Sequence, residues 1–417
     1  MKTEVSMNPF NENIKNNKIN YYTFKNLALK PYDKYELAPY SKTRIILMNG
    51  TEFESCWFYH QFARHVSNND LRRELAEIRR NEQQQQKRIA SLKPINETIL
   101  ETTLSYEQLA VDLTAIFAQR EKDVSVKNQL DFALLEDFDH LYRFTDMLEM
   151  DEKQNYKKLI GHYTEIMPGR PTISEHRHPY DDIRKPVNFC LADPITKMNV
   201  SIITAAEQQT MNYYMNVGSF YHTDHGRKMY SEIAMIEEQH VSGYESLKDP
   251  NTTWLECALM HEYTECYLYY SCYKDETNEY LKGVWEEHYF DELKHLNKIA
   301  SLLYKYEGKD YLDVILNPEF PLLLSFKENK KYIREVLRSV RLTSQLENYV
   351  NVGDLKKGNT FNLYQNAIIK NEKNVPSHKV IDKYITKFGE DLRYEESPHP
   401  IKELQDRRVD NTTVGRK

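Results

Sequence analysis

The chain has 417 residues and a net charge of −7, with 29% charged and 12% aromatic residues. No stretch approaches the roughly 18 consecutive apolar residues of a membrane helix, and charges of both signs are interspersed without a basic stripe. We therefore expect neither a membrane nor a nucleic acid as a partner. Residues 1–5 have no secretory pattern, and the five cysteines contain no Cys-x-x-Cys pair. We expect a cytoplasmic location and reduced cysteines.

In chain order, the pattern predicts an all-α protein of two tandem four-helix bundles. A proline-rich irregular connector separates the bundles, and a helical extension with a polar tail follows them. The expected domains are an N-terminal arm at 1–48, a first bundle at 49–150, the connector at 151–199, a second bundle at 200–306 and the extension at 307–417.

The two ends of the chain have their own patterns. The arm is Asn- and Lys-rich and is expected to be extended, ending in the apolar run 44–48. Residues 327–346 predict an amphipathic helix whose basic residues form a solvated face. From about residue 370 onward large apolar residues are few, which predicts a weakly packed or disordered tail.

A carboxylate and histidine pattern recurs at fixed spacing in the second bundle. Each half is one glutamate followed 30 residues later by Glu-x-x-His. Residues i and i+3 share a helix face, so each Glu-x-x-His pair presents an oxygen and a nitrogen to one point. Four carboxylates and two imidazoles are the ligands of a dinuclear metal site in a four-helix bundle. The predicted ligands are Glu207, Glu237, His240, Glu262, Glu292 and His295.

The turns between the predicted helices place these ligands at similar depth. Residues 248–251 are helix breakers, and Thr253 with Glu256 predicts a capping box that opens the next helix. At about 1.5 Å per residue, His240 and Glu262 both lie roughly 12–15 Å from that turn. An antiparallel bundle would bring all six ligands into one layer. The alternative is a buried network of charges without metal.

The first bundle resembles the second under a shift of 155 residues, which aligns 52–148 with 207–303. Thr98 and Glu101 reproduce the capping box, so Glu101 and Glu256 are expected to be helix starts and not ligands. The first copy has Gln85 where the second has His240, and Asp137 where the second has Glu292. We expect its metal site to be lost and the remaining groups to be held by hydrogen bonds; a weak metal site is the alternative. The candidate residues of this copy are Glu52, Glu82, Gln85, Glu107, Asp137 and His140.

The repeated Glu and Glu-x-x-His pattern resembles the ferritin-like dinuclear carboxylate proteins, and the residues around Glu207, Glu237 and Glu262 are most similar to rubrerythrin. The resemblance implies two iron ions, or manganese and iron, in the second bundle. It also implies that Glu265, beside Glu262, is either a mobile carboxylate that can swing onto the metals or one that lies just outside their ligands. Two features depart from the family: Glu237 and Glu262 are only 25 residues apart, where a long crossover is usual, and a rubredoxin-like cysteine module is missing from the sequence.

His288 lies four residues before Glu292 and shares its helix face. It resembles the additional histidine of arylamine N-oxygenases in the same superfamily, which would make it a further catalytic residue. The alternative is a supporting or surface histidine, and the first copy has Ala133 at this position.

The connector at 151–199 places turn formers beside groups that can bind metals or anions. These groups could cover a bundle mouth, bind an anion or hold another metal; alternatively, the connector is a linker wrapped between the repeats. The residues concerned are His162, Glu165, His176, Arg177 and His178.

The leading functional hypothesis is a nonheme dinuclear iron, or manganese–iron, oxidoreductase that acts on peroxide or dioxygen, with an external electron donor where one is needed. Glu265 and His288 are its predicted catalytic residues beside the six metal ligands. The alternatives are a non-enzymatic iron-handling protein, an arylamine N-oxygenase-like enzyme, and a structural or partner-binding scaffold that a bound metal stabilises. A homo-oligomer remains open. Nearby tyrosines are hydrogen-bond or radical partners, or simply core: Tyr213, Tyr214, Tyr263 and Tyr267.

Overall fold

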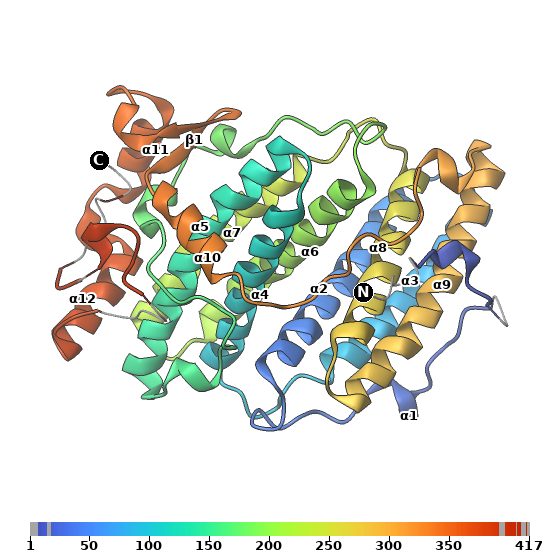
Figure 1. Cartoon of the computed structure of the whole chain (residues 1–417), viewed down its shortest axis with the longest axis horizontal. Helices are drawn as coiled ribbons and strands as arrows, with labels where there is room; N and C mark the ends of the chain where they lie inside the picture. Colours follow the sequence, from blue (N-terminus) through green and yellow to red (C-terminus); the bar gives the residue numbers. More distant parts are fainter. Residues whose placement is uncertain (1–6, 15–17, 392–396, 406, 410–413, 415–417) are drawn as a thin grey trace. The chain divides into compact units, whose positions relative to one another are not determined.

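The computed structural model describes residues 7–14, 18–391, 397–405, 407–409 and 414. In this part of the chain there are twelve α-helices and one two-stranded sheet (Figure 1), which confirms the all-α class. None of the described helices combines the length and apolar character that crossing a bilayer requires.

Eight long helices form the body of the protein. They are α2 (Pro39–Arg64), α3 (Asn69–Ala90), α4 (Ile99–Arg120), α5 (Val124–Met147), α6 (Pro194–Val217), α7 (Asp224–Glu245), α8 (Trp254–Asp275) and α9 (Glu279–Glu307). Side chains cap most of their N-termini, because the first turn of a helix leaves backbone N–H groups without partners. Both predicted capping boxes are present, at Thr98 with Glu101 and at Thr253 with Glu256.

The chain divides into two compact units that do not follow the repeats. Unit 1 comprises Met1–Asn96, Val187–Ala206 and Lys248–Phe326, and unit 2 comprises Glu97–Pro186, Glu207–Leu247 and Lys327–Lys417. Unit 1 therefore contains α2 and α3 of the first copy with α8 and α9 of the second. Unit 2 contains α4 and α5 of the first copy with α7 and the part of α6 that begins at Glu207, while the first part of α6 belongs to unit 1. This division differs from the expected successive bundles at 49–150 and 200–306.

The connections between hairpins explain the difference. Residues 91–98 lead from α3 in unit 1 to α4 in unit 2, and residues 246–253 lead from α7 in unit 2 to α8 in unit 1. Each carries a proline, Pro94 or Pro250, and a proline disfavours helical backbone at the preceding residue. At both points the chain passes into the other unit. The sequence had predicted a turn after which the next helix packs antiparallel to the preceding one.

Unit 1 is built on α2 packed against α3 and α8 packed against α9, with further contacts of α2 with α8 and of α3 with α9. Leucines and isoleucines fill the interior between these helices. Fully buried examples are Leu75, Ile78, Leu259, Leu293 and Leu296.

In unit 2, α4 packs against α5 and α5 against α7. A large apolar core includes Leu104, Phe138, Phe144, Tyr230 and Ile233. Further elements of this unit come from the C-terminal extension. They are α10 (Lys330–Val336), the antiparallel strands β1 (Leu342–Gln345) and β2 (Asn348–Asn351), α11 (Thr360–Ile369) and α12 (Pro376–Phe388).

Three local expectations differ from the structure. The apolar run 44–48 lies inside α2 and not at the end of an extended arm, because the helix already begins at Pro39, a favourable first-turn residue. The expected helix at 327–346 ends early and gives way to the β1–β2 hairpin, whose turn residue Leu346 has a φ of +53°.

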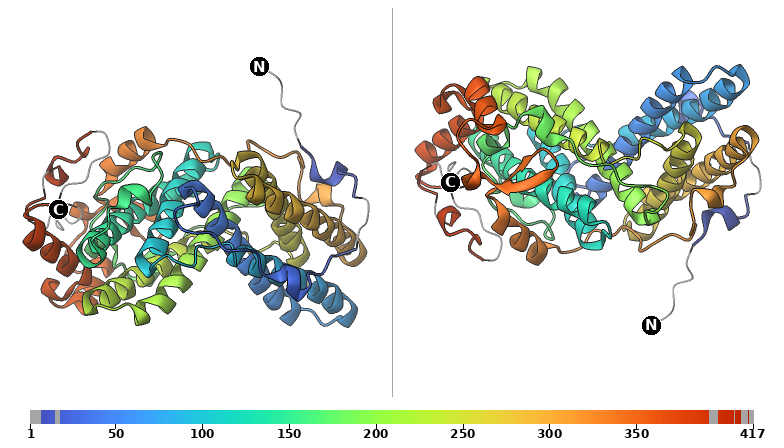
Figure 2. Two further views of the ribbon diagram at one scale, coloured as in Figure 1. Left: turned by 90° about the horizontal axis from the view of Figure 1, so that it is seen from below. Right: turned by 90° about the horizontal axis from the view of Figure 1, so that it is seen from above.

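The C-terminal tail contains more packed structure than expected. Helix α12 contacts α5 and α7, and its ribbon lies in the red part of the chain in Figure 2. It buries Val380 and Ile381. These two side chains and Tyr384 recur at helical spacing on one face, which offsets the generally polar composition. The end of the tail, including 392–396, lies partly outside the described residues.

The short helix α1 (Phe24–Leu27) contacts α3 within unit 1.

Candidate metal centres

Six ionisable side chains from four helices converge inside unit 2, and we call them the unit 2 cluster. Each is at most 1% exposed. The ligand atoms of Asp137, Glu207, Glu237 and His240 lie within 4.8 Å of one another, as do those of Glu107, His140 and Glu237. Glu237 thus joins the two groups. The full set is Glu107 on α4, Asp137 and His140 on α5, Glu207 on α6, and Glu237 and His240 on α7.

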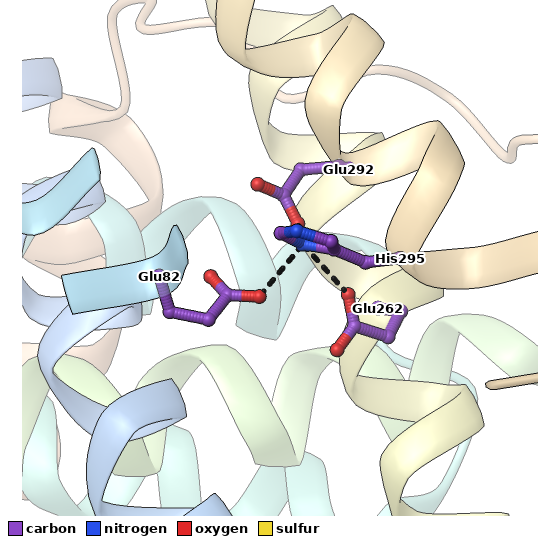
Figure 3. A group of neighbouring side chains, drawn as sticks. All are labelled: Glu82, Glu262, Glu292 and His295. Atoms are coloured by element: carbon purple, nitrogen blue, oxygen red, sulfur yellow. Dashed lines mark hydrogen bonds and ion pairs between the residues drawn. The ribbon is translucent and has the colours of Figure 1, made fainter. Parts of the chain in front are cut away.

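A second set converges inside unit 1, the unit 1 cluster, and all its members are fully buried. Glu82, Glu262, Glu292 and His295 form one group, and their side chains point toward one another (Figure 3). Glu52, Glu82 and Glu265 form another. The cluster draws Glu52 from α2, Glu82 from α3, Glu262 and Glu265 from α8, and Glu292 and His295 from α9.

The structure separates the six predicted ligands into two sets of three. Glu207, Glu237 and His240 lie in the unit 2 cluster. Glu262, Glu292 and His295 lie in the unit 1 cluster. Each set is completed by residues of the first copy, since each unit combines hairpins of both copies. The prediction of one layer holding all six therefore does not match the structure.

The first copy is accordingly not a separate degenerate site. Its Gln85 lies in unit 1, while its Asp137 and His140 lie in unit 2. The unit 2 cluster therefore retains four carboxylates and two imidazoles. No sequence signal could have revealed this, because each pattern of Glu and Glu-x-x-His fits either partner hairpin equally well.

Many ligand atoms of the clusters lack hydrogen-bond partners among the described residues. Among these residues, neither oxygen of Glu207, Asp137 or Glu265 has a hydrogen-bond partner, and Nε2 of His140 has none either. One oxygen each of Glu52, Glu107 and Glu262 is also without one. An unpaired buried carboxylate is costly. The residues therefore fit bound cations, which would pair with these atoms.

Burial and mutual repulsion shift the pKa values of the cluster carboxyls. In unit 2, burial raises the pKa of Glu207 to about 7 and that of Asp137 well above its usual value. Burial acts in the same direction on Glu237, but hydrogen bonds with His140 and His240 lower its pKa to about 2. In unit 1, burial and Glu82 raise the pKa of Glu292 to about 7. Without cations, these clusters hold protons near neutral pH.

The histidine of α7 is oriented by a buried ion network. His240 Nε2 lies 2.7 Å from Glu136 Oε2, and its Nδ1 faces Asp137 Oδ1 at 3.3 Å. Arg177 Nη1 lies 2.7 Å from Glu136 Oε1, and Arg170 donates to the same oxygen. Because the ionised Glu136 accepts the Nε2 proton, Nδ1 is left to bind a metal.

His295 has the same orientation in unit 1. Its Nε2 lies 2.9 Å from Asn81 Oδ1, while its Nδ1 lies 2.8 Å from Glu82 Oε1 and 3.6 Å from Glu262 Oε2. The carbonyl oxygen of Asn81 can only accept, which fixes the proton on Nε2.

The connector supports the unit 2 cluster, and this role was not predicted. Arg170, Glu175 and Arg177 are buried and form ion pairs with one another and with Glu136. His176 Nε2 lies 3.0 Å from Glu232 on α7. Of the predicted connector groups, Glu165 pairs with Arg334, and none of His162, His176 and His178 belongs to a donor group in the described part of the chain.

Three tyrosines hydrogen-bond to cluster carboxylates. Tyr214 donates to Glu107 Oε1 at 2.5 Å, Tyr59 donates to Glu262, and Tyr269 donates to Glu52. Tyr214 is one of the four tyrosines singled out in the sequence. The other three, Tyr213, Tyr263 and Tyr267, donate to backbone carbonyls.

His288 lies beside the unit 1 cluster without joining it. Its Nε2 accepts from Arg88 Nε at 3.1 Å, and its Nδ1 lies 3.1 Å from the Tyr269 hydroxyl. Both ring nitrogens are thus engaged, and burial lowers its pKa to about 3. Its position fits the supporting role that was the alternative for this residue. Glu265, by contrast, lies in the cluster itself.

Comparison with protein-family models, curated proteins and solved structures finds no match for this chain. The two clusters are therefore the basis on which a function can be assigned.

Proposed function

We propose that the chain is a ferritin-like dinuclear metal oxidoreductase that acts on peroxide or dioxygen, with a pair of iron ions in the unit 2 cluster. The observation that carries the proposal is the donor set of that cluster. It offers four buried carboxylates and two imidazoles, and most of their ligand atoms have no hydrogen-bond partner in the described part of the chain. Mixed carboxylate and imidazole ligands suit iron.

The residues of the cluster would bind the metals through different atoms. Glu107, Asp137, Glu207 and Glu237 supply oxygens, and His140 and His240 supply nitrogens. Two bound ferrous ions would provide one electron each, so that hydrogen peroxide and two protons give two water molecules. Tyr214 fixes one oxygen of Glu107 and leaves the other free to bind. Burial of the whole set keeps bulk water away from the reacting atoms.

Among the alternatives, an arylamine N-oxygenase-like enzyme depended on His288 as an extra ligand. The hydrogen bonds on both of its ring nitrogens argue against that role. A non-enzymatic iron-handling protein would use the same ligands, so reactivity must separate it from an oxidoreductase.

Rapid mixing of the ferrous protein with oxidants tests the proposal. The full chain, loaded with iron without oxygen, is mixed with hydrogen peroxide and separately with dioxygen, and its absorbance is followed. We expect iron oxidation within seconds, with the part of the absorbance change that belongs to unit 2 lost in the double variant Glu237→Ala/His240→Ala. Glu238→Gln is the matched control, because Glu238 is an exposed neighbour on the same helix. An unchanged spectrum with both oxidants would reject the enzyme and favour iron handling.

A further inference from the structure

We infer that the unit 1 cluster is a second metal centre with a different metal preference, in which manganese competes better against iron than it does in unit 2. The inference deepens the proposed function, since it takes unit 2 as the iron centre. It concerns the six fully buried donor residues of unit 1 and Gln85, which occupies the position of a histidine in unit 2.

The repeat aligns the two clusters position by position. Glu52, Glu82, Glu262, Glu292 and His295 of unit 1 correspond to Glu207, Glu237, Glu107, Asp137 and His140 of unit 2. Two further positions differ in kind. Unit 1 has Gln85 where unit 2 has His240, and Glu265 where unit 2 has Ala110. Relative to unit 2, unit 1 has therefore exchanged one imidazole for one carboxylate.

Gln85 does not replace the lost nitrogen ligand. Its Nε2 donates a hydrogen bond to Glu292 Oε1. The lone pair of an amide nitrogen is delocalised into the carbonyl, so only Oε1 of this side chain could bind a metal, as an oxygen donor. The side chain therefore holds a carboxylate of the cluster in place.

Glu265 supplies the fifth carboxylate. It is fully buried, its ligand oxygen lies within 4.8 Å of those of Glu52 and Glu82, and neither of its oxygens has a hydrogen-bond partner among the described residues. His261 Nε2 lies 3.4 Å from Glu265 Oε1, but His261 belongs to none of the donor groups. The set is thus five carboxylates and one imidazole.

The exchange changes the chemistry of the site in one direction. Carboxylate oxygens suit manganese and magnesium, whereas imidazole favours iron and the later metals. Replacing a nitrogen donor by an oxygen donor reduces the advantage of iron over manganese. The additional negative charge attracts any divalent cation and does not by itself discriminate between the two.

Two variants of the full chain isolate the centres. Glu237→Ala/His240→Ala leaves the unit 1 cluster, and Glu292→Ala/His295→Ala leaves the unit 2 cluster. Each apoprotein is incubated without oxygen with equal excesses of Mn²⁺ and Fe²⁺, freed of unbound metal, and analysed for both metals per chain by mass spectrometry. We expect a ratio of manganese to iron that is on the order of tenfold higher in the first variant. Equal ratios, or no metal in the unit 1 cluster, would overturn the inference.

A swap within unit 1 provides a test that does not depend on unit 2. In the variant that keeps only unit 1, Gln85→His with Glu265→Ala gives it the donor types of unit 2. The manganese-to-iron ratio should then fall toward the unit 2 value, whereas His261→Ala should leave it unchanged. Glu265→Gln, which preserves the side-chain volume, serves if the alanine variant does not fold. A fall of the ratio in His261→Ala instead would show that the assigned ligand set is wrong.

The two proposals can fail separately. If the unit 2 cluster bound no iron, the proposed function would fall, yet the swap in unit 1 would still report its own selectivity. If the swap had no effect while unit 2 reacted with peroxide, only the present inference would be rejected.

Discussion

The two clusters have corresponding donor positions on their helices, but different side chains support the donors. In unit 2, Arg170 and Arg177 hold Glu136, which holds His240. In unit 1, a chain of hydrogen bonds runs from Arg88 through His288 and Tyr269 to Glu52. The comparison teaches that one repeated helix pattern can place similar carboxylates and histidines in two distinct environments, because the residues behind them differ.

The unit 1 chain has a fixed direction. Arg88 can only donate, so Nε2 of His288 accepts and its Nδ1–H donates to the Tyr269 oxygen. The Tyr269 hydroxyl then donates to Glu52. The equivalent positions of unit 2 are Gly243, Ala133 and Thr114, which cannot form such a chain.

The space at Gly243 is already filled. A Cβ atom there would come within 2.6 Å of Gln129 Nε2, so an arginine could enter only if Gln129 moved.

Metal removal should have the largest effect on both units. Chelation leaves buried carboxylates without counter-charges, and we expect the melting temperature to fall by on the order of 10 °C. Differential scanning calorimetry of the loaded and chelated protein measures the change. Each of the two single-centre variants should show a smaller fall in melting temperature on chelation. An unchanged melting temperature of the unmodified protein would mean that the clusters are charge networks without metal.

The next largest effect should follow from breaking the ion network of unit 2. Arg170→Met leaves Glu136 and Glu175 with one arginine fewer in a fully buried site, and we expect a loss of about 3–5 kcal/mol in the free energy of unfolding. Urea denaturation measures it. Arg338→Met, at an exposed arginine that pairs with a neighbouring exposed glutamate, should cost little.

Proton binding should distinguish the metal-free protein from the loaded one. The pKa values of Glu207 and Glu292 are raised to about 7, so the folded state holds protons that the unfolded state has released. The stability of the metal-free protein should therefore decrease as pH rises from 6 to 8, by on the order of 1 kcal/mol for each carboxyl. Bound metal displaces these protons, and the loaded protein should show a flatter profile in the same melting experiment. A metal-free protein that became more stable over this interval would contradict the assignment.

The smallest effect should follow from Tyr269→Phe. The change removes the hydrogen bond to Glu52 and should weaken metal binding in unit 1 by roughly tenfold without affecting unit 2. Competition with a chromogenic chelator in the two single-centre variants measures both affinities. Tyr280→Phe is the control, since Tyr280 is half exposed on α9. Equal losses in the two centres would show that the tyrosine acts through general stability.

The local part of this structure could be predicted from the sequence. The capping residues Thr98 and Thr253 placed two helix starts correctly, and the spacing of Glu237 with His240 and of Glu292 with His295 put each pair on one helix face, as observed. These features depend on residues within a few positions of one another, so one sequence is sufficient.

Only the tertiary structure decided which hairpins pack together, and hence which ligands meet. The two copies are alike, so α8 and α9 could have completed a site with α7 as plausibly as with α3. The paths of 91–98 and 246–253 settle the choice by carrying the chain from one unit into the other. That choice depends on the packing of whole helices, which the local pattern of side chains does not encode. It divided the two Glu-x-x-His pairs between the units, with His240 in unit 2 and His295 in unit 1. His140 gives unit 2 a second imidazole, whereas Gln85 leaves unit 1 with one.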